Sequence, residues 1–226
     1  VKLTQDETDA TAELTIAGTT SLTSTGAANN LALDHADNSF TGAVTIVSGN
    51  DATIVTKDAI ELATVTLASG DLTVTTSNDN VTDATGAVIA VSGTATFTDG
   101  TGTVTLDSPS NDLTTVAATA ADATIKDADD IDLGDITVTA TLAVTALSSD
   151  ITDSGDVSVG TTSALTATSG DIIINGTANV FTGDVTFTVV AGADVTITDT
   201  TDFAIQSGLT VDNLTVTVDD ANITQA

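Results

Sequence analysis

Residues 151–174 read ITDSGDVSVGTTSALTATSGDIII and contain a pattern that recurs along the chain. Apolar residues alternate with polar ones in short runs, as at Val157 and Val159, and turn-forming clusters such as Ser169, Gly170 and Asp171 separate the runs. Alternation with a period of two predicts strands with one apolar face, and Gly, Asp and Ser favour tight turns. We therefore expect a series of short strands joined by turns.

The same alternation extends through the rest of the 226 residues. It recurs at Leu72 and Val74, Val104 and Leu106, Ile136 and Val138, and Val195 and Ile197. No segment combines a helical period with capping residues over three turns. The sequence therefore predicts an all-β protein with essentially no helix.

The chain also repeats itself about every seventy residues. One short motif returns at spacings of 74, 70 and 72 residues, as Thr8-Asp9-Ala10, Thr82-Asp83-Ala84, Thr152-Asp153-Ser154 and Thr224-Gln225-Ala226. Other landmarks keep step with it, such as Ile60, Ile131 and Phe203. A fixed period of this kind is typical of repeat architectures. We divide the chain into a lead-in segment, 1–10, and three repeats, 11–84, 85–154 and 155–226.

The number of strands in each repeat favours a solenoid. Roughly seven apolar dyads per repeat are too many for one hairpin pair, and coils of about twenty residues would accommodate them. Val, Ile, Leu, Ala and Thr suit thin, regular layers, and the only aromatic residues are five Phe. We expect a parallel β-helix, or β-solenoid, built from three repeats of about seventy residues and about 50 Å long.

Two segments carry a resemblance to a known family. Residues 151–174 and the segment NSFTGAVTIVSGNDATI at 38–54 resemble the repeats of filamentous-haemagglutinin-type bacterial exoproteins. These adhesins are described as right-handed parallel β-helices. The resemblance implies an extracellular protein at the cell surface, secreted across an outer membrane, with a role in attachment, aggregation or biofilm.

The charge balance excludes several partners. Three Lys or Arg stand against 32 Asp or Glu, which gives a formal net charge of −29. Nucleic acids and anionic membranes attract clustered basic residues, so we expect neither as a partner. No apolar run approaches the length that spans a bilayer. Only three of the acids are Glu and 29 are Asp, a turn residue, so most of them are expected in turns.

Catalytic residues are scarce. His35 is the only histidine, the chain has no Cys, and its three basic residues are scattered lysines. A nucleophile with its base, or a tuned acid–base pair, cannot be assembled readily from this set. We expect no enzyme and no required cofactor, and we expect His35 to be a solvated turn residue.

Calcium is the one ligand that the acids suggest, because hard cations bind carboxylate oxygens. The densest cluster supplies five candidate ligands, Asp127, Asp129, Asp130, Asp132 and Asp135. Their spacing matches neither an EF-hand nor the glycine-rich calcium repeat. The alternative is a solvated acidic face that keeps a fibre soluble.

These patterns predict a structural role. We expect a fibre or adhesin stalk segment whose partner is itself, either head to tail in a filament or as neighbouring repeats of a longer chain, with host or matrix surfaces as further partners. We find no atypical capping unit in the sequence and therefore expect both edges of the solenoid to bind a partner. The alternative is a calcium-dependent surface-layer or adhesive module made of tandem β-sandwiches.

Overall fold

A computed structural model of the chain describes residues 3–4, 12–24, 26, 28–47, 49–206 and 208–225. Within these residues the only regular structure is β-strand. The strands are β1 Leu3–Thr4, β2 Thr15–Ile16, β3 Thr20–Thr23, β4 Leu31–Leu33, β5 Ser39–Phe40, β6 Val44–Val47, β7 Ala52–Thr56, β8 Ile60–Leu67, β9 Leu72–Thr76, β10 Val81–Thr98, β11 Thr103–Leu106, β12 Asp112–Ala120, β13 Asp122–Asp127, β14 Ile131–Val138, β15 Thr141–Ala146, β16 Ile151–Asp153, β17 Val157–Val159, β18 Thr162–Ala167, β19 Ile172–Ile174, β20 Val180–Phe181, β21 Val185–Val189, β22 Val195–Asp199, β23 Phe203–Ile205, β24 Leu214–Val218 and β25 Ile223–Gln225. The prediction of an all-β chain without helix is confirmed.

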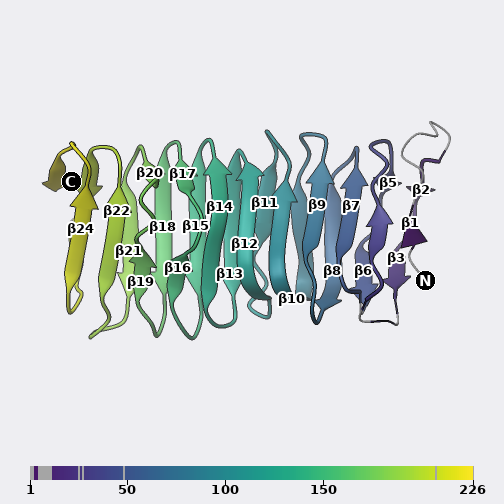
Figure 1. The fold of residues 1–226 in the computed structure, drawn as a ribbon, viewed down its shortest axis with the longest axis horizontal. Coiled ribbons are helices and arrows are strands. Elements are labelled where there is room, and N and C mark those ends of the chain that lie inside the picture. Colours follow the sequence, from purple (N-terminus) through teal and green to yellow (C-terminus); the bar gives the residue numbers. More distant parts are fainter. Residues whose placement is uncertain are drawn as a thin grey trace.

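The strands wind into a β-solenoid of about ten turns. Most strands pair in parallel with a strand one coil further on, so that Leu31 lies beside Ala52, Ala52 beside Leu72 and Leu72 beside Ala95. The coils stand side by side along the long axis of the molecule, with the two termini at opposite ends (Figure 1). The predicted solenoid is therefore confirmed.

The β-sandwich alternative is wrong. Every strand pairing among the described residues is parallel, and 23 strands belong to one continuous sheet. A β-sandwich is built from two antiparallel sheets, and tandem sandwiches would interrupt the stack between repeats. No such interruption occurs in the described part of the chain, because the pairings continue from β1 to β25.

Three columns of paired strands form the sides of the rod. Column A begins with β1, β4, β7 and β9, column B contains β11, β13, β15 and β18, and column C ends with β19, β22 and β24. Leu31, Val104 and Ile172 hold equivalent places in successive repeats, yet they lie in columns A, B and C. Each repeat therefore makes three full coils and then continues along about one of the three sides of a fourth coil. For this reason the next repeat starts one column further on.

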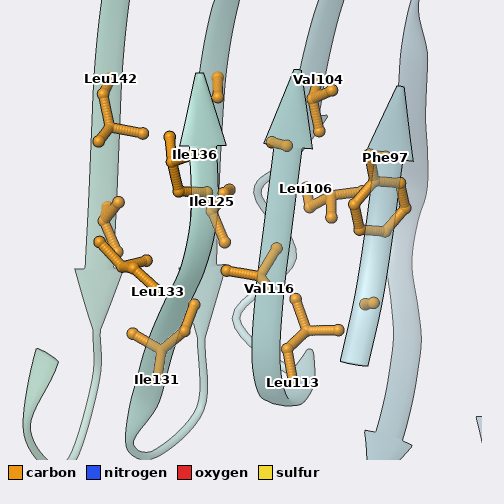
Figure 2. Packing of buried hydrophobic residues seen from close by; sticks show 14 of the residues in the cluster. Phe97, Val104, Leu106, Leu113, Val116, Ile125, Ile131, Leu133, Ile136 and Leu142 are labelled. Carbon is orange, nitrogen blue, oxygen red and sulfur yellow. The ribbon is translucent and has the colours of Figure 1, made fainter. Parts of the chain in front are cut away.

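The core is one continuous apolar cluster that runs through the coils. Similar side chains stack on one another, as in the ladder of Ile131, Ile151, Ile172 and Val195. Figure 2 shows side chains from several successive coils, among them Phe97, Leu106 and Val116, which belong to this cluster. Fully buried apolar side chains each contribute roughly 1.5–3 kcal/mol relative to exposure, so the stack is held mainly by this cluster.

Glycines occur where the corners of two coils touch. A Cβ at Gly183 would lie 1.4 Å from the carbonyl oxygen of Thr161, and one at Gly70 would lie 1.8 Å from that of Asn50. Any other residue there would push the coils apart. This close approach explains why the turn clusters of the sequence contain Gly.

Candidate functional site

Acidic side chains at the corners join one coil to the next. The carboxylate of Asp51 accepts the backbone N–H of Asp71 at 3.1 Å, and the carboxylate of Asp71 accepts that of Thr94 at 2.8 Å. A second ladder of this kind, with N···O distances of 2.8, 2.8 and 3.0 Å, runs through Asp150, Asp171, Asp194 and Asn213. Hydrogen bonds to a charged acceptor are stronger than neutral ones. Much of the Asp content of the chain therefore has a structural use.

The Asp of the repeat motif clamps a loop of the following coil. Asp83 accepts the backbone N–H groups of Asp107 and Ser108 at 3.1 and 3.0 Å and the side-chain amide of Asn111 at 2.8 Å. Asp153 makes the equivalent set of contacts at 2.8, 3.0 and 2.7 Å, to Asn175, Gly176 and Asn179. The first copy of the motif, residues 8–10, lies outside the described residues. In the last copy, Thr224 and Gln225 are described and Ala226 is not.

One fully buried asparagine recurs in each repeat, as Asn38, Asn111 and Asn179. Each side-chain oxygen accepts a backbone N–H of the preceding coil, at 2.9, 3.1 and 2.8 Å from Leu14, Ile89 and Val157. These asparagines were not expected from the sequence. Their spacing of 73 and 68 residues, close to the repeat length, was the signal that could have identified them.

The five predicted calcium ligands do not converge. Asp127 is fully buried, whereas Asp129, Asp130 and Asp135 are exposed and Asp132 is half-buried. The carboxylate of Asp127 accepts the backbone N–H of Leu113 at 2.7 Å and that of Asp129 at 3.0 Å. Asp135 instead accepts the N–H of Asp156 at 3.2 Å. Within the described residues no three His, Cys, Asp or Glu side chains are grouped closely enough to hold a metal ion.

A shallow hollow nevertheless lies over part of this cluster. It measures about 420 Å³ and is bordered by Asp112, Asp129, Asp130, Asp132 and Asp150, among others. The carboxylate of Asp132 is already engaged, because it accepts the hydroxyls of Thr115 at 3.1 Å and Thr152 at 3.4 Å and also that of Ser154. The hydroxyl contacts tie three successive coils together at this point.

Three buried carboxyl groups have raised pKa values. Burial raises the pKa of Asp99 to about 6 and that of Asp127 to about 7, and it also raises the pKa of Asp199. Asp127 and Asp199 accept backbone N–H groups, which offset part of this effect. Neither oxygen of Asp99 meets the geometry of a hydrogen bond, although the nearby N–H of Gly102 lowers its pKa somewhat. Asp127 is therefore no part of a solvated acidic face.

His35 was expected in solvent, and this prediction is wrong. The side chain is buried, and its Nδ1 accepts the backbone N–H of Asp37 at 3.2 Å. The strand that ends two residues before it, β4, pairs with β7, whose last residue Thr56 is buried and pairs with the buried Thr76. His35 is therefore part of the packed stack and not of a solvated turn.

The C-terminal end of the rod is apolar and open. Leu214 and Ile223 remain 39% and 49% exposed, whereas their counterparts in the middle repeat, Leu142 and Ile151, are fully buried. A hollow of about 450 Å³ lies beside them, bordered by Ile205, Leu209 and Val211 among others. The difference arises because a following coil covers Leu142 and Ile151, while the described residues place none over Leu214 and Ile223.

Comparison with protein families agrees with the repeat organisation. The model of one family, described as repeats of unknown function (DUF5649), matches the chain three times, at residues 2–47, 49–120 and 120–188. These limits differ in phase from the three repeats expected from the sequence, whose boundaries stay a prediction. No curated protein and no solved structure matches the chain. Among the described residues, no helix is long and apolar enough to cross a membrane.

Proposed function

We propose that this chain, which belongs to the family of repeats of unknown function DUF5649, is a structural rod segment of an extracellular fibre or adhesin stalk. In this role it sets a distance at the cell surface and lengthens by the stacking of further coils on its ends. The observation that carries the proposal is the apolar last coil, in which Leu214 and Ile223 are exposed although the same repeat positions are buried elsewhere. Solenoids bury such surfaces beneath neighbouring repeats or caps.

The polar chemistry of the rod supports a mechanical role without catalysis. Many corner carboxylates accept hydrogen bonds from the next coil, and the Asp83 and Asp153 carboxylates each hold a loop in place. His35 is buried. A general acid or base needs access to a substrate, which the buried His35 lacks, and the carboxylates of Asp83 and Asp153 are already engaged in hydrogen bonds that hold the coils. We therefore propose no reaction and no required cofactor, and we assign the exposed acids to solubility rather than to a calcium site.

The surroundings of the rod follow from its charge and from the resemblance to filamentous-haemagglutinin-type adhesins. A net charge of −29 disfavours nucleic acids and anionic membranes and keeps rods apart along their sides. End-to-end contact and attachment to a host or matrix surface remain the favoured interactions. We propose an extracellular, cell-surface location and a role in attachment or biofilm on these grounds.

Surface labelling of intact source cells tests this proposal. Antibodies raised against the purified chain should decorate extended material on the outside of the cells in electron micrographs. Permeabilised cells serve as the control for total antigen. Label that appears only after permeabilisation would contradict an extracellular rod.

A further inference from the structure

The two ends of the rod expose complementary repeat positions. Leu22 in β3 is only half-buried, whereas its counterparts Phe97 and Leu165 are fully buried. At the other end Val216 in β24 is half-buried, although its counterparts Val74 and Val144 are fully buried. Within the described part of the chain, each end therefore leaves partly uncovered the positions that the interior of the stack covers completely.

The interior pairings show which positions cover which. Val74 lies beside Phe97 and Val144 lies beside Leu165, one coil further on in both cases. Val74 and Val144 correspond to Val216, and Phe97 and Leu165 correspond to Leu22. In two interior places, therefore, the residue equivalent to Val216 pairs with the residue equivalent to Leu22.

The two ends also lie on the same side of the rod. Column C begins with β3 and ends with β24, and within the described residues it comprises ten strands, namely β3, β6, β8, β10, β12, β14, β16, β19, β22 and β24. Because each repeat advances the pattern by one column, three repeats return it to the column where it began. A strand equivalent to β3 is therefore due in column C directly after β24.

We propose that a second copy of this chain docks through its β3 on β24, with Leu22 of one copy beside Val216 of the other and without rotation about the rod axis. The proposal rests on the proposed function and specifies its partner and register. The columns and the apolar core continue across the joint, as in any interior coil. The contact is heterologous and does not close, so repeated docking produces a fibre.

The same equivalence assigns a place to β25. Val81 lies beside Val104 and Ile151 beside Ile172, so Ile223 belongs beside Leu31 of the docked copy. In the single chain that place is held by Leu3 of β1. Docking therefore replaces β1 of one copy by β25 of its neighbour, a form of strand addition to an open sheet edge.

Charge sets the conditions for docking. Two copies of formal charge −29 repel each other. At physiological ionic strength, salt largely screens the repulsion between charges that are more than about 8–10 Å apart. The joint itself is apolar. Docking should strengthen as salt is raised, which is the opposite of an ion-paired interface.

Single cysteines on outward-facing positions test the register without disturbing the core. Thr217 and Thr23 are exposed, and their counterparts pair as Thr75 beside Thr98 and Thr145 beside Thr166. The chain contains no Cys, so each variant carries one thiol. Adjacent strands lie about 4.8 Å apart, within the range that a disulfide bridges. Thr217→Cys protein mixed with Thr23→Cys protein should form a disulfide-linked dimer under mild oxidation.

Two matched mixtures serve as controls. Ser21→Cys is exposed on the same strand but two residues out of register, about 7–8 Å from its diagonal neighbour, and Thr124→Cys is exposed in the middle of the rod. Each, mixed with Thr217→Cys protein, should give on the order of tenfold less dimer, since the effective concentration at a docked joint is in the millimolar range. Equal yields from all mixtures, or no dimer from any, would overturn the proposal. Such a result would leave the surface rod intact, because surface labelling tests that role separately.

Discussion

The middle of the rod and its last coil contain nearly the same residues in different surroundings. In β15 and β16, Leu142 and Ile151 are fully buried between coils, whereas in β24 and β25, Leu214 and Ile223 are 39% and 49% exposed. The strands themselves pair in the same parallel manner. The difference shows that the burial of a position in this fold is a property of the next coil. Stability in such a stack comes from nearest-neighbour interfaces.

Truncation of matched leucines should separate the two regions most strongly. Leu142→Ala removes a fully buried side chain and should lower the free energy of unfolding by about 2–5 kcal/mol. Leu214→Ala should cost less than about 1 kcal/mol, because the side chain is already partly in water. Denaturant unfolding at a protein concentration low enough to prevent docking measures both. Similar losses would mean that the last coil is covered in solution.

A matched pair of asparagines should give the next largest difference. Asn111→Ala leaves the buried backbone N–H of Ile89 without its acceptor and removes one of the three hydrogen bonds that Asp83 accepts, so it should cost roughly 1–3 kcal/mol. Asn213 is exposed at the end of a corner ladder, and Asn213→Ala should cost about 0.5 kcal/mol or less. Thermal unfolding of the two variants compares them. Equal effects would contradict a special role for the buried asparagine of each repeat.

The buried carboxyl groups should make stability fall as pH rises. The pKa of Asp99 is about 6 in the folded protein against 3.8 ordinarily, so the folded state binds this proton more tightly than the unfolded state does. The stability due to the protonated group is fully present below about pH 4 and is lost as pH rises through about 6. Melting temperatures of Asp99→Asn protein should fall less over this window than those of the wild type.

Asp184→Asn is the control for the pH experiment, because Asp184 is exposed and its substitution removes the same single formal charge. That variant should follow the wild-type curve. If Asp99→Asn and Asp184→Asn shift the curve alike, general charge repulsion rather than burial of Asp99 sets the pH dependence.

The smallest expected effect concerns divalent cations at the corner of Asp129, Asp130 and Asp132. A solvated acidic corner screens without selectivity, so calcium and magnesium chlorides at equal concentration should raise the melting temperature equally. A bound calcium ion would instead stabilise the folded state according to its affinity. A clearly larger rise in melting temperature with calcium than with magnesium, abolished by Asp130→Asn, would instead indicate a specific calcium site at this corner.

The fold was largely predictable from the sequence because its two signals are local. Alternation assigns the strands, and apolar landmarks such as Ile60, Ile131 and Phe203 are indeed buried at equivalent places. The advance of one column per repeat was not predictable, since it depends on the ratio of repeat length to coil length. Alternation alone does not reveal which strand lies one coil away.

The polar interior was less predictable than the apolar one. Asp127 was expected as a calcium ligand or as part of a solvated acidic face, and His35 as a solvated turn residue, yet both are buried. Their burial depends on hydrogen bonds to groups elsewhere in the chain, such as the N–H of Leu113 for Asp127. Pairing between coils decides such contacts, and the residues next to Asp127 or His35 in the sequence do not indicate them.

Electron microscopy of the purified chain at physiological salt tests both the continuous stack of coils and the docking of its ends. Ten coils at about 4.8 Å give a unit about 50 Å long, and docked units should form unbranched fibres of constant width, with lengths in multiples of that unit. Val216→Asp protein should remain as single short rods. Compact particles, or beads joined by flexible links, would contradict a continuous stack of coils.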